Sequence, residues 1–335
     1  MLTNKSILIT GGTGSFGKQF IKTILNIYQP DRIVIYSRDE LKQFDMQNSE
    51  FFQSEKVLIR YFIGDVRDYR RLKKAMEDVD IVVHAAALKQ VPATEYNPFE
   101  AVKTNVLGAQ NVIDAALETG VQKVIALSTD KAAAPINLYG ATKLTSDKLF
   151  ISANNYKGKH DIKFSVVRYG NVMGSRGSVI PFFLEQKEKG ILPITDERMT
   201  RFNITLKEGV DFVLQCFERM WGGELFVPKI PSYRILDVAK AVAPDCKREI
   251  VGIRPGEKLH EDMITDSDAT NTIEFEDYYV IAPSIPIWSN KEFINKSNSS
   301  KGKPCEEGFN YNSRTNQDFL SVNELKKLIK ENITL

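Results

Sequence analysis

A glycine-rich octapeptide near the start of the chain constrains the fold more than any other feature. The sequence Thr10-Gly11-Gly12-Thr13-Gly14-Ser15-Phe16-Gly17 follows a short apolar run and opens an amphipathic stretch. Glycines at these spacings permit a tight turn, let backbone N–H groups approach a phosphate at a helix N-terminus, and allow close helix-to-sheet packing. The sequence therefore predicts a dinucleotide-binding turn. The residues expected to contact the cofactor there are Gly11, Thr13, Gly14, Ser15, Phe16 and Gly17.

The first half of the chain alternates short β-branched runs with longer amphipathic stretches, which is the pattern of βαβ units in a parallel sheet. Several runs are apolar on both faces, as in a sheet covered by helices on both sides. The expected strands are Ser6–Thr10, Arg32–Tyr36, Leu58–Ile63, Ile81–Ala85, Lys123–Ser128 and Phe164–Val167. The expected helices are Phe16–Tyr28, Tyr69–Met76, Phe99–Thr119 and Leu138–Asn155. These elements predict an α/β fold, a Rossmann-type doubly wound parallel sheet.

Beyond about Gly170 the expected elements are shorter and more mixed. They are the helices Val179–Lys189 and Lys207–Met220 and the strands Glu224–Val227 and Ile250–Ile253. Ser284–Thr315 is polar without periodicity, which predicts a loop, a flexible extension or a surface wrap, and Val322–Asn332 is expected to dock back as a helix. We therefore expect a cofactor domain over 1–170, open to completion by later strands, a smaller substrate-binding lobe mainly over 171–283, and an extension over 284–335.

Composition and charge exclude several classes of function. The 335 residues carry 45 Lys and Arg against 43 Asp and Glu, so no overall field would hold nucleic acid or an anionic membrane. No stretch approaches about 18 uncharged apolar residues, and no signal-peptide layout is present, so we expect no membrane association. The three cysteines lack metal or disulfide spacing, which favours a reducing, cytoplasmic setting and no metal site.

The residues after the second expected strand bear on the choice between NADP and NAD. Ser37 and Arg38 stand where the ribose 2′ position of a cofactor arrives, and they offer a hydroxyl and a guanidinium for a 2′-phosphate. We therefore expect NADP. Asp39 keeps NAD open as the alternative, because an acid at this point would bind ribose hydroxyls.

The ends of the third and fourth expected strands complete the cofactor site. From Gly64-Asp65-Val66, the Asp65 carboxylate can accept from an adenine amino group while Val66 packs on the ring. After His84, the small side chains of Ala85 and Ala86 leave room for a cofactor against the strand. His84 itself has no metal or triad partner at a suitable spacing, so we expect a buried structural histidine.

Tyr139 and Lys143 carry the strongest catalytic signal. They stand four residues apart on an expected helix and so share one face. An ammonium beside a phenol favours the phenolate and should lower the phenol's pKa from about 10 toward the working pH. The pair predicts a base that takes a hydroxyl proton while a hydride leaves the adjoining carbon.

These motifs make the chain resemble an extended short-chain dehydrogenase/reductase. The resemblance implies that Thr129 hydrogen-bonds the reacting oxygen, and that Lys42, Lys89 and a structural Asn105 belong to the cofactor site beside Tyr139 and Lys143. Asp130-Lys131 is similar to the inverting UDP-N-acetylglucosamine 4,6-dehydratases of bacterial flagellar pseudaminic acid synthesis, whereas retaining dehydratases carry Asp-Glu there. The likeness is dense over about the first 280 residues and includes Tyr36–Lys42, His84–Lys89, Tyr169–Val172, Arg198–Phe202 and Arg254–Lys258.

The chemistry of such a dehydration assigns a role to each catalytic residue. The C5 hydrogen of a sugar becomes acidic only after C4 is oxidised, so Tyr139 first takes the C4 hydroxyl proton as the nicotinamide takes a hydride. A neutral Lys131 then abstracts the C5 proton, and a protonated Asp130 donates to the departing C6 hydroxyl. Hydride return to C6 and reprotonation of C5 on the opposite face would give UDP-2-acetamido-2,6-dideoxy-β-L-arabino-hex-4-ulose.

Cations and donors in the second half are expected to hold the UDP-sugar. Asn171, Arg176, Arg201 and Arg254 are candidates for the diphosphate, Glu257 for ribose hydroxyls, and Lys89 and Thr129 for the sugar. Thr195 and Asp196 are expected at the uracil end. The full predicted substrate set is Lys89, Thr129, Asn171, Val179, Thr195, Arg201, Arg254 and Glu257. The resemblance also implies a homo-oligomer, either a dimer or a hexamer.

Two other functions stay open at this point. A UDP-hexose 4-epimerase of the same fold needs Tyr139, Lys143 and Thr129 but makes no use of Asp130 and Lys131. A non-catalytic, dinucleotide-sensing protein would have no use for a tuned phenol. The acidic and basic neighbours after Thr129 therefore favour the dehydratase.

Overall fold

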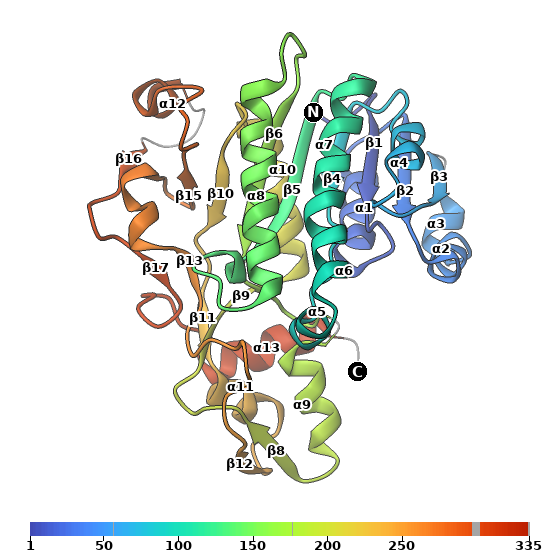
Figure 1. Cartoon of the computed structure of the whole chain (residues 1–335). Helices are drawn as coiled ribbons and strands as arrows, with labels where there is room; N and C mark the ends of the chain where they lie inside the picture. Colours follow the sequence, from blue (N-terminus) through green and yellow to red (C-terminus); the bar gives the residue numbers. More distant parts are fainter. Residues whose placement is uncertain (56, 176, 297–301, 334–335) are drawn as a thin grey trace.

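A ten-stranded sheet runs through the centre of the molecule (Figure 1). The computed structural model describes residues 1–55, 57–175, 177–296 and 302–333. The strand order is β16-β14-β15-β10-β6-β5-β4-β1-β2-β3. Their bounds are β1 Ser6–Thr10, β2 Arg32–Ser37, β3 Leu58–Ile63, β4 Ile81–His84, β5 Lys123–Thr129, β6 Lys163–Tyr169, β10 Leu225–Pro228, β14 Thr272–Glu274, β15 Tyr278–Ile281 and β16 Lys303–Pro304.

The seven strands from β3 to β10 pair in parallel, and the doubly wound Rossmann-type fold is confirmed. All six predicted strands of the first half are present, with ends that differ by at most two residues. The strands β14, β15 and β16 add an antiparallel edge beyond β10. The sheet thus takes four strands from residues after 170, while the predicted domain boundaries themselves stay a prediction.

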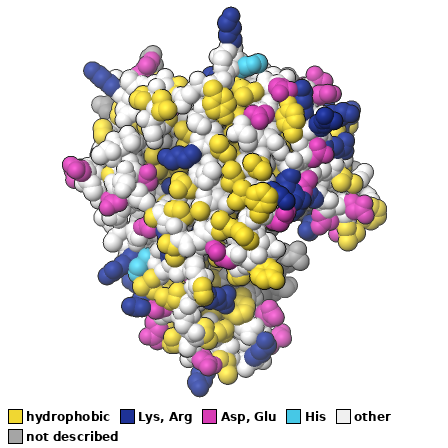
Figure 2. Space-filling model, in the orientation of Figure 1, with side chains coloured by type: hydrophobic (Ala, Val, Ile, Leu, Met, Phe, Trp, Pro, Cys, Tyr) yellow, Lys and Arg dark blue, Asp and Glu magenta, His cyan; other side chains and the backbone are white. Residues whose placement is uncertain are grey.

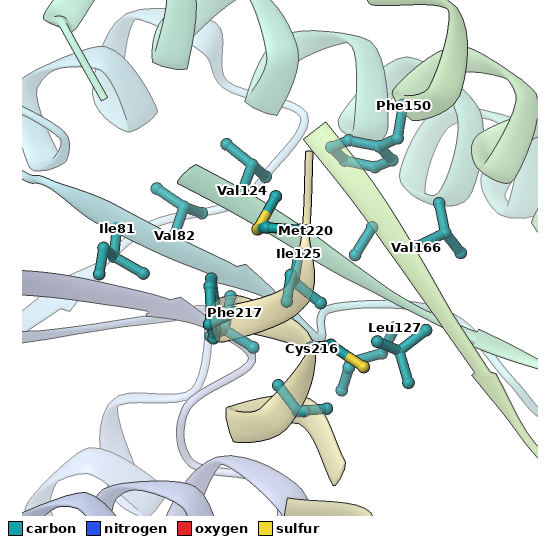
Figure 3. Close-up of a cluster of buried hydrophobic side chains, with 14 of the residues drawn as sticks. Ile81, Val82, Val124, Ile125, Leu127, Phe150, Val166, Cys216, Phe217 and Met220 are labelled. Carbon is teal, nitrogen blue, oxygen red and sulfur yellow. The ribbon is translucent and has the colours of Figure 1, made fainter. Parts of the chain in front are cut away.

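Two layers of helices cover the sheet. The helices α4 (Tyr69–Ala75), α7 (Gly108–Thr119) and α8 (Leu138–Tyr156) lie on one face, and α1 (Ser15–Ile27) and α10 (Leu206–Arg219) lie on the other (Figure 1). In Figure 3, Phe150 of α8 packs on one side of β4, β5 and β6, and Phe217 of α10 packs on the opposite side. Both rings are fully buried, which explains why these strands are apolar on both faces.

The predicted helix Phe99–Thr119 is interrupted. It consists of α6 (Pro98–Val102), a π-helical turn at Lys103–Leu107 and α7. The side chain of Asn105 explains the interruption, because its amide bonds both backbone groups of Leu88 at 2.8 and 2.9 Å. The short helices α2 (Glu40–Gln47) and α3 (Glu50–Ser54) follow one another between β2 and β3 in the chain. The short helix α5 (Val91–Tyr96) comes directly before α6.

A smaller lobe with its own core lies at the carboxyl ends of the parallel strands. Its helices are α9 (Val179–Lys187), α11 (Ile235–Val242) and α13 (Val322–Asn332), and its strands are β7 (Asn171–Val172), β8 (Ile191–Ile194), β9 (Thr200–Ile204), β11 (Ser232–Arg234) and β12 (Lys247–Ile250). The docking of the last helix is confirmed: Leu325 and Ile329 of α13 are buried in this second core. Ser321 and Glu324 form a reciprocal capping box at the N-terminus of α13.

Two expectations for the second half are wrong. The strand predicted at Ile250–Ile253 ends at Ile250 and begins at Lys247, because Gly252 adopts a left-handed φ of 88° that an extended strand does not allow. Residues 284–315 are not all irregular, since they contain α12 (Asn290–Lys296), β16 and β17 (Tyr311–Asn312). The strand β17 pairs with β13 (Asp262–Ile264), which brings the tail beside the lobe. Among the described residues, no helix is both long and apolar enough to cross a membrane.

Candidate active site

A single cleft of about 1660 Å³ runs between the carboxyl edge of the parallel strands and the smaller lobe. Pockets for one drug-sized ligand span about 300–1,000 Å³, so this cleft has room for a dinucleotide and a second nucleotide together. Most predicted site residues line it. These are Gly11, Thr13, Gly14, Ser15, Phe16, Gly17, Ser37, Arg38, Lys42, Asp65, Val66, Ala85, Ala86, Lys89, Thr129, Lys131, Tyr139, Lys143, Asn171, Val179, Thr195, Arg201, Arg254 and Glu257.

Three predicted residues stand apart from the cleft wall. Asp130 is fully buried behind Lys131. Asn105 is committed to Leu88 and to the Thr142 hydroxyl at 3.0 Å, so its amide holds the protein backbone and does not reach into the cleft. Asp196 does not line the uracil end, since its carboxylate pairs with Arg198 at 2.8 Å. The remaining candidate, Arg176, lies outside the described residues.

The glycine turn has the shape that a pyrophosphate requires. Gly11 adopts φ of 68°, and a Cβ on Gly17 would lie 2.5 Å from the Gly12 backbone, so both positions exclude larger residues. Helix α1 begins after Gly14 without any side-chain cap. Gly14 has no side chain that could accept from the first N–H groups of this helix, whose N-terminus lines the cleft, and a phosphate group fits there.

His84 supports this turn from below. It is 1% exposed, and its Nδ1 lies 2.8 Å from the hydroxyl of Thr10, which in turn accepts from the N–H groups of Ala85 and Ala86. Burial and the nearby Lys143 ammonium lower the pKa of His84 to about 3, so the ring is neutral. The expectation of a buried structural histidine is confirmed.

The end of β2 and the start of α2 place two cations, Arg38 and Lys42, near the hydroxyl of Ser37. The Ser37 oxygen accepts from the Gln43 side-chain amide at 3.0 Å, which leaves the hydroxyl hydrogen free to donate. Arg38 is half exposed, and the Lys42 ammonium lies 2.6 Å from the Asp39 carboxylate. Lys42 thus offsets the negative charge of Asp39, and both line the cleft together with Ser37 and Arg38.

The Asp65 carboxylate pairs with two guanidinium groups, those of Arg67 and Arg38, which the sequence did not predict. Burial acts against its charge, but the guanidinium of Arg67, at 2.6 and 2.9 Å, and that of Arg38 hold the pKa of Asp65 below its ordinary value. The side chain of Asn111 donates to the carbonyl of Val66 and fixes the next residue of the loop. The loop that follows β3 is therefore held in place before any adenine binds.

Lys131 occupies the centre of the catalytic end. The strand β5 ends at Thr129, and a short 3₁₀ turn at Asp130–Ala132 carries the lysine into the cleft. Its Nζ lies 3.0 Å from Oδ1 of Asp130, 3.3 Å from Oε1 of Glu261 and 3.4 Å from Oδ1 of Asn171. Burial opposes the charge, yet the two carboxylates raise the pKa of Lys131 above its ordinary value. In this state Lys131 is an ammonium, and the neutral base expected from the sequence has to be generated.

Tyr139 and Lys143 lie on α8, which begins at Leu138 after an Asn137 cap. Burial raises the pKa of the Tyr139 phenol to about 12, although the Lys131 cation and a hydrogen bond with Thr129 both lower it. Burial also lowers the pKa of Lys143. The tuning of the phenol by Lys143 stays a prediction: burial opposes the charged forms of both side chains, and Lys131 is the cation that lowers the pKa of Tyr139 in this arrangement.

A buried ion pair that sequence reasoning missed lies beneath Lys143. Asp147, one helical turn later, accepts from the Ser128 hydroxyl at 2.6 Å and from Arg168 at 3.2 Å. The guanidinium of Arg168 also donates to the Met263 carbonyl at 2.9 Å. The pair links β5, β6 and α8 to the segment that carries Glu261.

Glu261 is the second group that sequence reasoning missed. Its side chain is 2% exposed and lines the cleft. The residues predicted from this part of the sequence were Arg254 and Glu257. The sequence carries no signal that separates Glu261 from its neighbour Asp262, because only the fold buries the first acid, just before β13, and leaves the second partly exposed. A buried acid requires a charged or hydrogen-bonding partner.

Arg201 has a different role from the predicted diphosphate ligand. Its guanidinium donates to the carbonyls of Thr200, Leu259 and Lys258 at 2.7–3.1 Å and lies 3.7 Å from Glu261. Two of these three bonds hold the segment before β13, and the third goes to Thr200 on β9. The side chain therefore braces the cleft wall, and Arg254 stays the candidate for the diphosphate.

The comparisons with known proteins agree with this arrangement. A family model described as a polysaccharide biosynthesis protein matches residues 7–283. A protein of Campylobacter jejuni subsp. jejuni serotype O:23/36 (strain 81-176), named UDP-N-acetylglucosamine 4,6-dehydratase (inverting), is 58% identical, covering 98% of each chain. A protein of Rickettsia conorii named UDP-glucose 4-epimerase is 45% identical, covering 84% of each. The X-ray structure of Pen from Bacillus thuringiensis matches with a TM-score of 0.88 and 38% identity, covering 99% of this chain and 98% of that one.

Proposed function

We propose a reaction for this chain from one premise: the chain belongs to the polysaccharide biosynthesis protein family, within the extended short-chain dehydrogenase/reductases. The reaction is the C5-inverting 4,6-dehydration of UDP-N-acetylglucosamine to UDP-2-acetamido-2,6-dideoxy-β-L-arabino-hex-4-ulose. The observation that carries it is the Asp130–Lys131 ion pair, which lies beside Thr129 and Tyr139 at one end of the cleft. A 4-epimerase needs only the phenol and the threonine.

The cofactor is a nicotinamide dinucleotide, which when bound takes a hydride from C4 and returns one to C6. The uncapped turn at Gly14–Gly17 would hold its pyrophosphate. We propose NADP over NAD, because Ser37 and Arg38 offer donors to a 2′-phosphate while Lys42 offsets the negative charge of Asp39. Binding of both cofactors, measured by calorimetry on the wild type and on Arg38→Ala, tests this choice; tighter binding of NAD than of NADP by the wild type would overturn it.

Tyr139 accepts the C4 hydroxyl proton in the first step. The hydrogen bond with Thr129 and the positive charge of Lys131 both favour the phenolate, and they oppose the effect of burial. Lys143 lies on the same face of α8 and also lines the cleft. The ketone that forms at C4 makes the C5 hydrogen acidic.

The hydrogen bond between Lys131 and Asp130 can generate both groups that the elimination needs: Lys131 as the base and Asp130 as the acid. Transfer of one proton from Lys131 Nζ to Asp130 Oδ1, across 3.0 Å, turns the ion pair into a neutral amine and a carboxylic acid. The amine takes the C5 proton, and the buried acid passes its proton to the C6 hydroxyl through the Thr129 hydroxyl, which lines the cleft 3.0 Å from Asp130 Oδ1; water leaves and a C5–C6 double bond forms. This elimination restores the original ion pair. With the hydride returned to C6, a solvent proton would add to C5 on the face opposite Lys131 and invert its configuration, while Tyr139 releases to solvent the proton that it took from the C4 hydroxyl.

Proton NMR of UDP-N-acetylglucosamine with purified protein in heavy water tests the proposal. The expected product has a new C6 methyl signal, collapsed by deuterium at C5, and the couplings of an L-arabino sugar. A sugar changed only at C4 would identify the epimerase. An unchanged sugar, together with no transient absorbance near 340 nm, would favour the dinucleotide-sensing protein.

We also propose a cytoplasmic homo-oligomer that acts at the first step of pseudaminic acid synthesis. The three cysteines are free thiols, which fits a reducing compartment. Hydrophobic side chains gather over the middle of the face in Figure 2. Tyr96, Phe99 and Leu107, on α5, α6 and the following π-helical turn, are each at least half exposed. Sedimentation would separate a dimer from a hexamer.

A further inference from the structure

We propose that Glu261 is a positioning residue for Lys131, one that fixes the orientation and the proton affinity of this catalytic base. The inference rests on the proposed dehydration, in which Lys131 takes the C5 proton. Glu261 acts through Lys131, and its own carboxylate transfers no proton in the reaction.

The contacts of the ammonium give the first argument. An ammonium has three N–H donors, and Lys131 Nζ has three oxygen neighbours, on Asp130, Asn171 and Glu261, at 3.0–3.4 Å. Asp130 is adjacent in the chain, Asn171 lies on β7, and Glu261 lies just before β13. The three acceptors thus come from three segments, and Glu261 is the one whose charge is additional to the proton-transfer pair.

The balance of charge gives the second argument. Asp130 and Lys131 have the same total charge as an ion pair and as a neutral pair, so their proton transfer needs no outside proton. Arg201 adds one positive charge 3.7 Å from Glu261, and Glu261 offsets it. Without Glu261 the buried cluster would carry a net positive charge next to the base. The charged or titratable groups around Lys131 are Asp130, Tyr139, Arg201, Tyr233, Lys258 and Glu261.

The anchoring of Glu261 gives the third argument. Its backbone N–H donates to the Ser313 hydroxyl at 2.9 Å, and its carbonyl accepts from Ser313 N–H at 2.8 Å. Ser313 is fully buried, and its hydroxyl also lies 2.8 Å from that of Thr200. The tail segment next to β17 therefore holds Glu261 against the base, which gives part of the polar tail a role at the active site.

The direction of the effect follows from the two carboxylates. Both raise the pKa of Lys131, so removal of one lowers it and makes the neutral amine more abundant at a given pH. A unit charge this close shifts a pKa by about two units in a partly buried site. In Glu261→Gln the neutral fraction of Lys131 at pH 9 should therefore rise about 100-fold.

Competitive amine labelling measures that fraction without substrate. Acetic anhydride is applied at pH 9, and mass spectrometry gives the labelling rate of Lys131 in the folded full-length protein. We expect about 100-fold faster labelling in Glu261→Gln, a rate near that of the wild type in Glu261→Asp, and no change in Glu274→Gln. The last variant removes a carboxylate that pairs with Lys229 and Lys303 away from the cleft.

The pH profile of product formation provides the second readout. The acid limb of Glu261→Gln should move to lower pH by about one to two units, while Glu261→Asp keeps the limb of the wild type. Unchanged labelling in Glu261→Gln, or equally fast labelling in Glu261→Asp, would overturn the role of Glu261. If the wild type forms no 4-keto-6-deoxy sugar, the dehydratase proposal fails, and the labelling rates still decide whether Glu261 controls Lys131.

Discussion

The cofactor turn and the charged cluster around Lys131 are built in opposite ways. The turn is one contiguous octapeptide in which four of the eight residues are glycine, so that backbone N–H groups are open to a ligand. The cluster gathers ionised side chains from the end of β5, from β9 and from the segment before β13, together with the neutral amide of Asn171 on β7. The turn depends on local geometry, whereas the cluster depends on the whole topology and on the tail.

This difference predicts how each region fails. A change in the turn acts through steric contact and should weaken cofactor binding alone. A change in the cluster acts through charge in a buried site and should alter proton transfer alone. Cofactor binding and proton transfer, both measured on variants of each region, therefore test whether the two regions fail separately.

Lys131→Ala should have the largest effect. It removes the C5 base, so product formation and deuterium uptake at C5 should fall about 10³-fold, while cofactor binding by calorimetry stays within about twofold. Lys240→Ala, which removes a surface lysine beside Asp237, is the matched control. Unchanged deuterium uptake at C5 in Lys131→Ala would contradict the assignment of the base.

Gly17→Ala should come next. The new Cβ would lie 2.5 Å from Gly12 and push the turn away from the helix, so we expect about 100-fold weaker cofactor binding. The labelling rate of Lys131 should not change. Gly209→Ala is the matched control, because its Cβ meets only Ile204 at 3.9 Å inside α10. Weaker binding in both variants would show that the close approach at Gly17 is not the cause.

His84→Gln should have a smaller effect, seen in stability against pH. The folded pKa of His84, about 3, lies below the ordinary value of 6.5, so its contribution is complete above pH 6.5 and is lost as pH falls toward 3. Between pH 6.5 and 5 the wild type should lose about 2 kcal/mol from this group, and the variant should not. Urea unfolding at both pH values measures it, with the exposed His160→Gln as control. Parallel losses in the wild type and His84→Gln would contradict the burial argument.

Ser313→Ala should have the smallest effect. It removes the acceptor of the Glu261 N–H, which should cost about 1 kcal/mol of unfolding free energy and raise the labelling rate of Lys131 severalfold. Cofactor affinity should stay the same. Ser267→Ala, at an exposed position, is the control. A drop in stability without any change at Lys131 would limit Ser313 to a structural role.

The sequence predicted the region built from neighbouring residues better than the region built from distant segments. The strands, the glycine turn and the Tyr139–Lys143 face were predictable, because each depends on residues close together in the chain. The roles of Glu261 and Arg201 were not, because they arise from contacts between β9 and residues some 60 positions later. The raised pKa of Lys131 was missed for the same reason, since one of its two carboxylates is distant in sequence.

The pairing of β17 with β13 has a consequence for the order in which the enzyme matures during synthesis. The parallel strands β1 to β6 and the glycine turn are complete once residue 169 has been made, and domains generally begin to fold from the N-terminal side. The segment that holds Glu261 gains its partner only when residues 311–313 emerge. A nascent chain could thus acquire its cofactor well before it could dehydrate a sugar.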